Sequence, residues 1–290
     1  MRFILGIDGG GTSCRAALAT PDGTILARAK SGSANIYTNL AGARASIVEA
    51  AQMAFAEAGE DAGLVAETPA LLGLAGANVG DNARQLEAVL PFRKSIVETD
   101  AMIALEGAVG SGDGAIAILG TGTAYLGRRG GEARPIGGWG FLIGDQGSGA
   151  QVGRELLERT LLAFDGVGPS SPLTDEILAV FKGDPDRIIT FGTTAKPGDF
   201  AGFAPKVFDH AETGDEVAQA ILARGLSTIE ASIARFGLQP GEPLSLLGGL
   251  ASLYEPRLSE PIRALVRPPQ QDALGGAVSM AARLFGVLKA

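Results

Sequence analysis

The sequence predicts an α/β protein of two domains that share one architecture. Its 290 residues leave room for about two domains of ordinary size. In the first half, strand-like and helix-like segments follow one another in the order βββαβαβ. A glycine-rich turn follows the first strand of each half, and Gly11-Thr12 aligns with Gly122-Thr123 at an offset of 111 residues. This internal repetition indicates that one architecture is used twice.

Three short strands are expected to open the first half. The apolar run 3–7 ends at Asp8 and three glycines, a pattern typical of a buried strand that enters a tight turn. Pro21-Asp22-Gly23 favours a second turn, because proline presets φ and glycine accepts a positive φ. The expected strands run over 3–7, 14–20, 24–30, 70–75 and 95–99, and the expected helices over 40–58 and 81–90.

The second half repeats the meander and is otherwise mainly helical. Its expected strands run over 115–119, 124–128, 132–136 and 244–247, and its helices over 147–163, 174–181, 200–210, 215–236 and 272–288. We expect the domain boundary near 107–114, which gives domains of 1–108 and 109–290.

Composition excludes several classes of protein. Lys and Arg number 24 against 32 Asp and Glu, and the resulting net charge of −8 disfavours nucleic acid and anionic membranes as partners. One cysteine and one histidine cannot form a disulfide or a Cys/His zinc site. The longest uncharged stretch, 114–127, is too short to span a bilayer, and Asp8 follows the N-terminal apolar run too soon for a signal peptide. A soluble, cytoplasmic protein is expected.

Two glycine turns are candidate phosphate-binding sites. Glycine lets the backbone approach an anion, since no Cβ intervenes and successive N–H groups can point into one concavity. The turns consist of Gly9, Gly10, Gly11 and Thr12, and of Gly120, Thr121, Gly122 and Thr123. Asp8, at the end of the first strand, offers a hard oxygen ligand for Mg²⁺. Either turn alone fits an ordinary hairpin, but two at equivalent points of a repeat favour a ligand.

Other phosphate motifs are missing from the sequence. None of the lysines follows a glycine, so there is no GxxxxGK[ST] loop, and no GxGxxG lies between a strand and a helix. P-loop NTPases and Rossmann dehydrogenases are therefore disfavoured.

Seven ordered motifs resemble those of a known family. They are GIDGGGTSCRAAL (6–18), SGSANI (31–36), ETDA (98–101), ILGTGTAYL (118–126), GGWGFLIGDQGSGAQVG (137–153), LLGGLA (246–251) and DALGGA (272–277). Together they resemble sugar kinases of the actin/hexokinase/Hsp70 superfamily, in particular the bacterial glucosamine kinases and eukaryotic-type N-acetylglucosamine kinases of the BadF/BadG/BcrA/BcrD ATPase family. The resemblance implies two RNase H-like domains (an actin-like ATPase fold) that close over a nucleotide- and sugar-binding cleft.

The resemblance also implies roles for individual residues in ATP binding and catalysis. The two glycine turns would be the phosphate loops, and Gly248 and Gly249 the adenosine motif, the alternative being a glycine pair that admits a helix. Gly275-Gly276 is expected to allow close helix packing. Asp100, directly after a strand, would be the general base, the alternative being a helix N-cap.

A third group of residues is predicted to bind the sugar, because a hexose presents hydroxyls that need charged acceptors and C–H faces that favour an aromatic surface. It consists of Asn35, Asp100, Gly138, Trp139, Asp145 and Gln146. The alternatives are a core tryptophan and solvated loop residues, but glycines flank Trp139 where a core would supply leucines. The Gly-Gly-Trp-Gly segment is closer to the N-acetylglucosamine kinases, whereas DGGGTSC and SGSANI are closer to the glucosamine kinases.

We therefore expect an enzyme that transfers the γ-phosphate of ATP, with Mg²⁺, to the 6-hydroxyl of glucosamine. N-acetylglucosamine is the alternative acceptor. More remote alternatives are an activator ATPase of a CoA-ester reductase or dehydratase, disfavoured because Cys14 is the only cysteine, and a non-catalytic nucleotide-binding protein. ATP and an amino sugar are the expected partners, and the apolar stripe on 215–236 is read as core or as a homodimer face.

Overall fold

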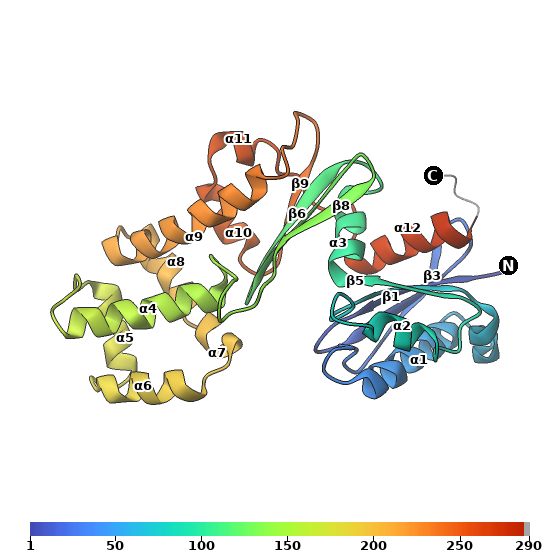
Figure 1. Ribbon diagram of the computed structural model, residues 1–290, viewed down its shortest axis with the longest axis horizontal. Coiled ribbons are helices and arrows are strands. Elements are labelled where there is room, and N and C mark those ends of the chain that lie inside the picture. Colours follow the sequence, from blue (N-terminus) through green and yellow to red (C-terminus); the bar gives the residue numbers. More distant parts are fainter. Residues whose placement is uncertain (287–290) are drawn as a thin grey trace. The chain divides into compact units, whose positions relative to one another are not determined.

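The computed structural model describes residues 1–286, which form two compact units (Figure 1). The first unit contains residues 1–112 and 268–286, and the second contains residues 113–267. This division differs from the expected domains at one point: the chain returns to the first unit after residue 267, whereas the expected second domain runs unbroken from 109 to 290. Each unit is an α/β body with its own sheet, as the sequence predicts.

The first unit confirms the predicted order βββαβαβ. Its elements are β1 (Ile4–Gly9), β2 (Cys14–Ala19), β3 (Ile25–Ser31), α1 (Leu40–Glu57), η1 (Ala62–Glu67), β4 (Ala70–Leu74), α2 (Asn82–Glu87), β5 (Ser95–Thr99), α3 (Asp100–Val109) and α12 (Ala273–Phe285). The helix α2 is shorter than the predicted 81–90. The sheet order is β3-β2-β1-β4-β5, with β4 and β5 parallel to β1 and the hairpin strands antiparallel.

Helices cover both faces of this sheet (Figure 1). Leu5 and Ile7 of β1 pack with α1 on one face, while Ile4 packs with α3 and α12 on the other. The alternation follows from the period of two along a strand. Because both faces are covered, β1 reads as a continuous apolar run, as in buried parallel strands.

The helix α12 joins the first unit because its backbone can approach α3 and β1 closely. A Cβ on Gly276 would overlap the carbonyl oxygen of Ile103, and a Cβ on Gly6 would lie 2.6 Å from the Val278 side chain. Arg283 of α12 also forms an ion pair with the buried carboxylate of Glu106 on α3. The prediction that Gly276 serves helix packing is confirmed.

The sheet of the second unit repeats four strands of the first sheet, and a single bridge stands in place of the fifth. The elements of this unit are β6 (Gly114–Leu119), β7 (Thr123–Arg129), β8 (Glu132–Gly137), α4 (Gly149–Phe164), α5 (Pro172–Val180), α6 (Pro185–Thr194), α7 (Pro197–Ala201), α8 (Ala204–Glu212), α9 (Glu216–Ala234), β9 (Leu244–Leu247), α10 (Ala251–Tyr254), η2 (Glu255–Arg257) and α11 (Glu260–Arg263). The sheet order is β8-β7-β6-β9. Where β5 lies in the first unit, Val266 forms a single parallel bridge with Leu244.

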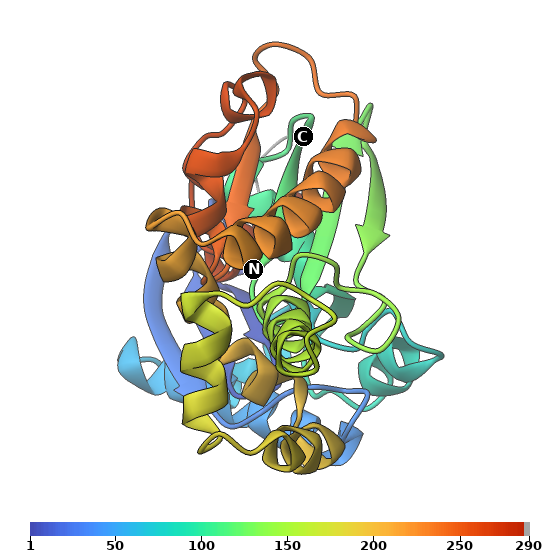
Figure 2. The ribbon, with the colours of Figure 1, turned by 90° about the vertical axis from the view of Figure 1, so that its left-hand side faces the viewer.

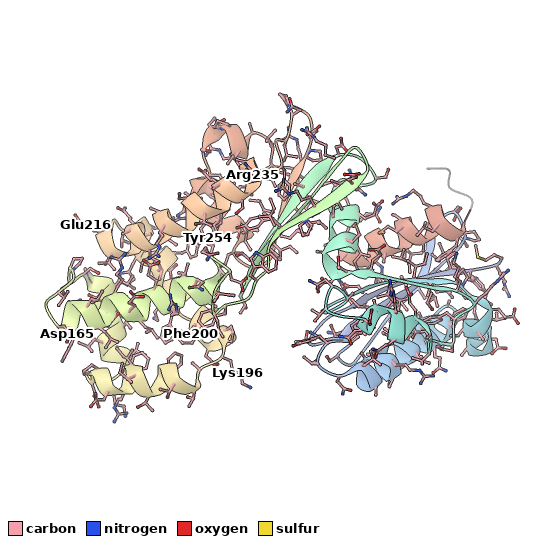
Figure 3. All side chains as sticks on the ribbon, viewed as in Figure 1. Asp165, Lys196, Phe200, Glu216, Arg235 and Tyr254 are labelled. Atoms are coloured by element: carbon pink, nitrogen blue, oxygen red, sulfur yellow. The ribbon has the colours of Figure 1, made fainter. Side chains whose placement is uncertain are left out.

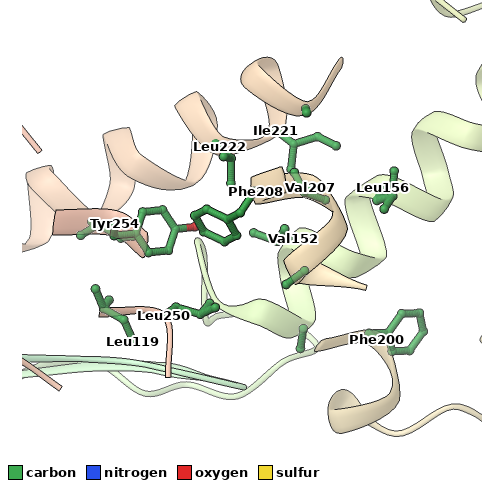
Figure 4. Packing of buried hydrophobic residues seen from close by; sticks show 14 of the residues in the cluster. Leu119, Val152, Leu156, Phe200, Val207, Phe208, Ile221, Leu222, Leu250 and Tyr254 are labelled. Atoms are coloured by element: carbon green, nitrogen blue, oxygen red, sulfur yellow. The ribbon is translucent and has the colours of Figure 1, made fainter. Parts of the chain in front are cut away.

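A large apolar core holds the helices of this unit against β6 and β7, and Figure 2 turns these helices toward the viewer. Figure 4 shows Tyr254 and Phe208 at its centre, with their rings edge to face and 5.1 Å apart. Exposed charged residues mark helix ends: Figure 3 labels Asp165, Lys196, Glu216 and Arg235, which lie at termini of α4, α7 and α9.

Two details of the helical part differ from the sequence prediction. The predicted helix 200–210 is two helices, α7 and α8, because Gly202 ends the first and Pro205 lies in the first turn of the second. The helix α6 and the short helices α10 and α11 were not predicted. Within residues 1–286, no helix combines the length and the apolar character needed to cross a membrane.

We predict that Gly276→Ala lowers stability by about 1–3 kcal/mol, since the added methyl group must push α12 away from α3. The matched control is Gly192→Ala in α6, where a Cβ would meet nothing within 4 Å. That variant should be about 0.5–1 kcal/mol more stable than the wild type. Urea unfolding followed by circular dichroism measures both. A Gly276→Ala protein as stable as the wild type would contradict the proposed close packing.

Candidate active site

The first glycine turn joins β1 to β2 and is open on its outer side. The N–H of Gly10 donates to the carbonyl oxygen of Ser13 at 2.9 Å, which closes the turn. A Cβ on Gly9 would lie 2.6 Å from Leu74, so the fold itself requires that glycine. A Cβ on Gly11 would meet nothing within 4 Å, and neither Gly10 nor Gly11 has a positive φ. The fold does not require glycine at these two positions, which supports the approach of a ligand there.

Asp8 is held by an arginine through one of its two oxygens. The Nε and Nη2 groups of Arg15 both donate to Oδ2 of Asp8, the former at 3.1 Å, and Nη1 of Arg15 lies 3.2 Å from Asp272. Among the hydrogen bonds of residues 1–286, none involves Oδ1 of Asp8. The residues described include no group of three or more His, Cys, Asp or Glu able to hold a metal ion. A Mg²⁺ ion at Asp8 would therefore take its other ligands from phosphate and water.

Asp100 begins α3 at the carboxyl end of β5. The N-cap is Thr99, whose Oγ1 accepts a hydrogen bond from the N–H of Met102 at 3.2 Å. The Oδ1 atom of Asp100 accepts only from the neighbouring N–H of Ala101, at 2.8 Å, among the bonds described. The alternative that Asp100 is the N-cap is therefore wrong.

The electrostatic surroundings of Asp100 suit a base. Burial raises the pKa of Asp100, and the nearby negative charge of Asp8 raises it further. Its backbone hydrogen bonds oppose this shift without cancelling it. A carboxylate whose pKa is raised has a greater affinity for a proton, which is what general-base catalysis requires.

Asn35 lies in the loop that passes the first glycine turn. The N–H of Ala34 donates to the carbonyl oxygen of Gly10 at 2.9 Å. The Oδ1 atom of Asn35 accepts from the N–H groups of Tyr37 and Thr38, at 3.0 and 3.2 Å. The side-chain oxygen of Asn35 thus stabilises the loop, and its side-chain NH₂ group is available to donate to a ligand.

The second glycine turn joins β6 to β7 and supports the start of α4. The N–H of Gly120 donates to the carbonyl oxygen of Gly122 at 3.0 Å. The carbonyl oxygens of Gly120 and Thr121 accept from the N–H groups of Gly149 and Ala150, at 2.8 and 3.2 Å. The start of α4 is thereby fixed to the turn.

The 137–147 segment, called the Trp139 loop below, has an unusual backbone. Five of its residues have a positive φ: Gly137, Gly138, Gly140, Asp145 and Gly147. The Trp139 side chain is 77% exposed, so the alternative of a core tryptophan is wrong. Leu142 and Ile143 are also exposed, at 91% and 84%. The loop therefore presents three large apolar side chains to its surroundings.

Asp145 and Gln146 return the Trp139 loop to the second glycine turn. A Cβ on Gly122 would lie 2.7 Å from Oδ2 of Asp145, so this carboxylate lies directly against the turn. Burial raises the pKa of Asp145, against the opposing effect of hydrogen bonds from Gly140 and Thr123. The carbonyl oxygen of Gln146 accepts from Oγ1 of Thr123 at 3.3 Å. The structure thus brings Asp145, Gln146 and the second turn together.

Of the two glycines after β9, the fold requires a glycine at the first position but not at the second. Gly248 has a φ of +93°, and a Cβ there would overlap the carbonyl oxygen of Leu119. Gly249 is exposed, and a Cβ there would meet nothing within 4 Å. Packing therefore explains Gly248, while Gly249 leaves open surface of the kind that an adenine ring needs.

Sequence reasoning missed two residues that contact these segments. Arg15, which holds Asp8, is the charged residue within the buried strand β2, a signal that was available in the sequence. Gln151 donates from α4 to two carbonyl oxygens of the Trp139 loop. Nothing in the sequence marks that contact, because it depends on how the loop folds back over the helix.

The equivalent sheets and their glycine turns define the actin-like ATPase class of folds. The chain belongs to the BadF/BadG/BcrA/BcrD ATPase family, whose model matches residues 5–278.

Three relatives cover most of the chain. The Vibrio cholerae protein named glucosamine kinase GspK is 37% identical over 288 residues, which span 98% of this chain and 97% of the relative. The Dictyostelium discoideum protein named N-acetyl-D-glucosamine kinase is 31% identical over 272 residues, 85% of each chain. A crystal structure from Chromobacterium violaceum, provisionally described as an N-acetylglucosamine kinase, has a TM-score of 0.84 at 32% identity and covers 96% of this chain and 98% of its own.

We predict that Asp100→Asn is at least as stable as the wild type at pH 7. Because the folded-state pKa of Asp100 is raised, the stability that its protonated form contributes is lost as the pH rises through that pKa, and an amide avoids this loss. The advantage of the variant should shrink toward pH 4. Urea unfolding across this range measures the difference.

Asp22→Asn is the control for this prediction, because hydrogen bonds from Thr20 and Thr24 lower the pKa of Asp22. Its effect should have the opposite sign, with a loss of stability at pH 7 that shrinks as the pH falls. If Asp100→Asn is markedly less stable than the wild type at pH 7, the raised pKa is incorrect.

Proposed function

We propose that this protein is a kinase that transfers the γ-phosphate of ATP to the 6-hydroxyl of glucosamine. The observation that carries the proposal is the likeness to glucosamine kinase GspK over nearly the whole of both chains. The structural features that support it are the open glycine turns, Asp100 with its raised pKa, and the Trp139 loop.

The glycine turns bind the phosphates of ATP. Phosphoryl transfer depends mostly on positioning and on neutralising the charge of the transferring group. The N–H groups around Gly11 and the hydroxyls of Thr12 and Thr121 are the donors for this, whereas the hydroxyl of Thr123 already donates to the carbonyl oxygen of Gln146. Gly249 provides the flat surface for the adenine ring.

Asp8 holds Mg²⁺ through Oδ1, directly or through water. The fit rests on the hydrogen-bond pattern, since Arg15 engages only Oδ2. When bound, Mg²⁺ neutralises charge on the transferring phosphate. Arg15 fixes the orientation of the Asp8 carboxylate. Its positive charge lies between the carboxylates of Asp8 and Asp272.

Asp100 takes the proton of the acceptor hydroxyl. Its carboxylate is free of the capping role, and its pKa is raised. Asp145 and Gln146, with the NH₂ group of Asn35 and the backbone of Gly138, bind the sugar hydroxyls. The exposed ring of Trp139 faces the C–H groups of the sugar.

N-acetylglucosamine is the second candidate acceptor. Two of the three relatives described above carry that substrate in their names, and the exposed Leu142 and Ile143 beside Trp139 offer apolar surface for an acetyl group. Glucosamine is favoured because its ammonium group gains from a nearby carboxylate such as Asp145. A site built for one should reject the other through an unpaired polar group.

Other assignments are less well supported. An activator ATPase needs several cysteines for its cluster, whereas Cys14 is the only one and lies buried in β2 with its pKa raised to about 12. A cytoplasmic location follows from the use of ATP and stays a prediction, as does a homodimer.

We predict that glucosamine gives the highest kcat/KM in a panel of glucosamine, N-acetylglucosamine, glucose and N-acetylmuramic acid with Mg²⁺ and ATP. The positive charge on the 2-amino group is the reason for this order. A coupled ADP-release assay measures each sugar. A clear preference for glucose would refute the amino-sugar proposal, and a preference for N-acetylglucosamine would establish the second candidate.

We predict that Asp100→Asn loses about 10²- to 10⁴-fold in kcat, the usual contribution of a general base. Its affinity for ATP, measured by calorimetry, should remain that of the wild type. Asp113→Asn is a suitable control, because that carboxylate accepts from the N–H of Gly130 at the β7–β8 turn, in the second unit. A loss of less than about tenfold in Asp100→Asn would assign the base to another residue.

A further inference from the structure

Gln151 makes two hydrogen bonds to the Trp139 loop from the first turn of α4. Its Nε2 group donates to the carbonyl oxygens of Phe141, at 2.5 Å, and Gly144, at 2.9 Å. A primary amide nitrogen carries two N–H donors, so both carbonyls are satisfied by one side chain. The orientation of the amide follows from its partners, since both can only accept.

We propose that Gln151 is a positioning residue for the sugar: it fixes the Trp139 loop relative to the second glycine turn. This inference rests on the proposed function, in which the loop binds the sugar and the turn binds phosphate. Gln151 touches neither substrate in this proposal and acts through the loop.

Gly144 connects the hydrogen bonds of Gln151 to Trp139 and Asp145, two of the residues assigned to the sugar. The N–H of Gly144 donates to the carbonyl oxygen of Gly140 at 2.7 Å, and a Cβ on Gly144 would lie 2.8 Å from the Cβ of Trp139. Asp145 follows directly, at a φ of +60°, in the left-handed region that non-glycine residues seldom adopt. Such a conformation persists only where its surroundings fix it. The grip on the Gly144 carbonyl is part of that fixation.

Apolar packing holds this loop at Phe141, whose ring lies 5.1 Å from that of Phe200 and packs against the core, but not at the two residues that follow. Leu142 and Ile143 are almost fully exposed, so they add little buried area. A pocket of about 180 Å³ also lies between the loop, α4 and α9. The residues that line it include Leu142, Ile143, Gln146 and Gly147 from the loop, Gln151 and Arg154 from α4, and Arg224 and Thr228 from α9. With a hollow beside residues 142–144, the position of this part of the loop depends in part on polar contacts such as those of Gln151.

The same turn of α4 is fixed to the second glycine turn. Gly149 and Ala150 donate their N–H groups to Gly120 and Thr121, and Ser148 caps the helix by accepting from the N–H of Gln151 at 3.2 Å. The backbone of this helix turn thus binds the second glycine turn, and the side chain of Gln151 binds the Trp139 loop. A displacement of about 1 Å between acceptor and donor can cost about 10²-fold in rate, so this link should affect catalysis.

The test compares Gln151→Met with Gln151→Glu and Arg154→Met. Methionine keeps the length and flexibility of glutamine but has no donor, and glutamate places a carboxylate against two carbonyl oxygens. Arg154→Met is the matched control: Arg154 lies on the same helix, lines the same pocket and makes no hydrogen bond to the loop among the bonds described. Each variant is assayed with glucosamine and ATP, and its thermal unfolding is recorded.

Trp139 provides a readout that needs no sugar, since it is the only tryptophan in the chain and lies on the loop. In the ligand-free protein, Gln151→Met should lower the fluorescence anisotropy of Trp139, because the loop moves more freely. Its KM for the sugar should rise about tenfold and its kcat/KM should fall about 10²-fold, with the dissociation constant of ATP within twofold of the wild-type value. Gln151→Glu should show larger effects, and Arg154→Met none.

Two results would overturn the proposal. One is wild-type Trp139 anisotropy together with a wild-type sugar KM in Gln151→Met. The other is a parallel loss of ATP affinity and thermal stability, which would mean that Gln151 merely supports the start of α4. If the wild type phosphorylates no amino sugar, the proposed function fails, and the ligand-free anisotropy still decides whether Gln151 holds the loop.

Discussion

The absence of a Cβ at a few backbone positions is the constraint on which both units depend. In the first unit, Gly6 and Gly276 let α12 lie against β1 and α3, and this contact brings the end of the chain back to the unit where it began. In the second unit, Gly248 lets β9 end against the carbonyl oxygen of Leu119. Any side chain at these positions would force whole elements apart, because protein interiors are closely packed.

A second group of glycines serves no such purpose, and the contrast carries information about function. At Gly11 and Gly249 a Cβ would meet nothing within 4 Å, and neither residue has a positive φ. Glycine at a position that tolerates a side chain costs conformational entropy without any gain for the fold. For these two positions we propose that the gain comes from ATP, since both lie in segments that we assign to it. Open space at a glycine does not by itself identify a site, since Gly192 in α6 has the same freedom.

Much of the first unit could be predicted from local pattern, and less of the second. The strands β1 to β5 are short apolar runs between turn residues, and local pattern also gives their order along the chain. The helix α6 and the division into α7 and α8 depend on Gly202, Pro205 and tertiary packing, which hydrophobic periodicity does not record. The return of α12 could not be foreseen, because a contact between residues 103 and 276 has no local signal.

Prediction of the candidate site shows the same limit. The carboxylates Asp8, Asp100 and Asp145 were found because they stand beside strand ends or glycines. Arg15 and Gln151 were missed because their roles depend on partners that only the fold brings near. That the two groups of residues act on the same substrates stays a prediction.

The backbone at Asp145 gives a further reason to assign that residue a chemical role. Among residues 1–286, only Asp145 and Lys182 are non-glycine residues with a positive φ. Lys182 follows the C-cap of α5, where a left-handed residue commonly ends a helix, so its conformation has a local explanation. Asp145 lies in a loop where Gly137, Gly138, Gly140 and Gly147 adopt the same region, and glycine there would avoid the strain.

An aspartate is nevertheless present at position 145, and its carboxylate is partly buried against Gly122 with a raised pKa. Both the backbone strain and the burial of the charge oppose folding, and the hydrogen bonds from Gly140 and Thr123 offset the effect of burial only in part. Strain of this kind is characteristic of residues that a site requires for their chemistry. We therefore propose that the carboxylate acts on a ligand, which in the proposed reaction is the acceptor sugar.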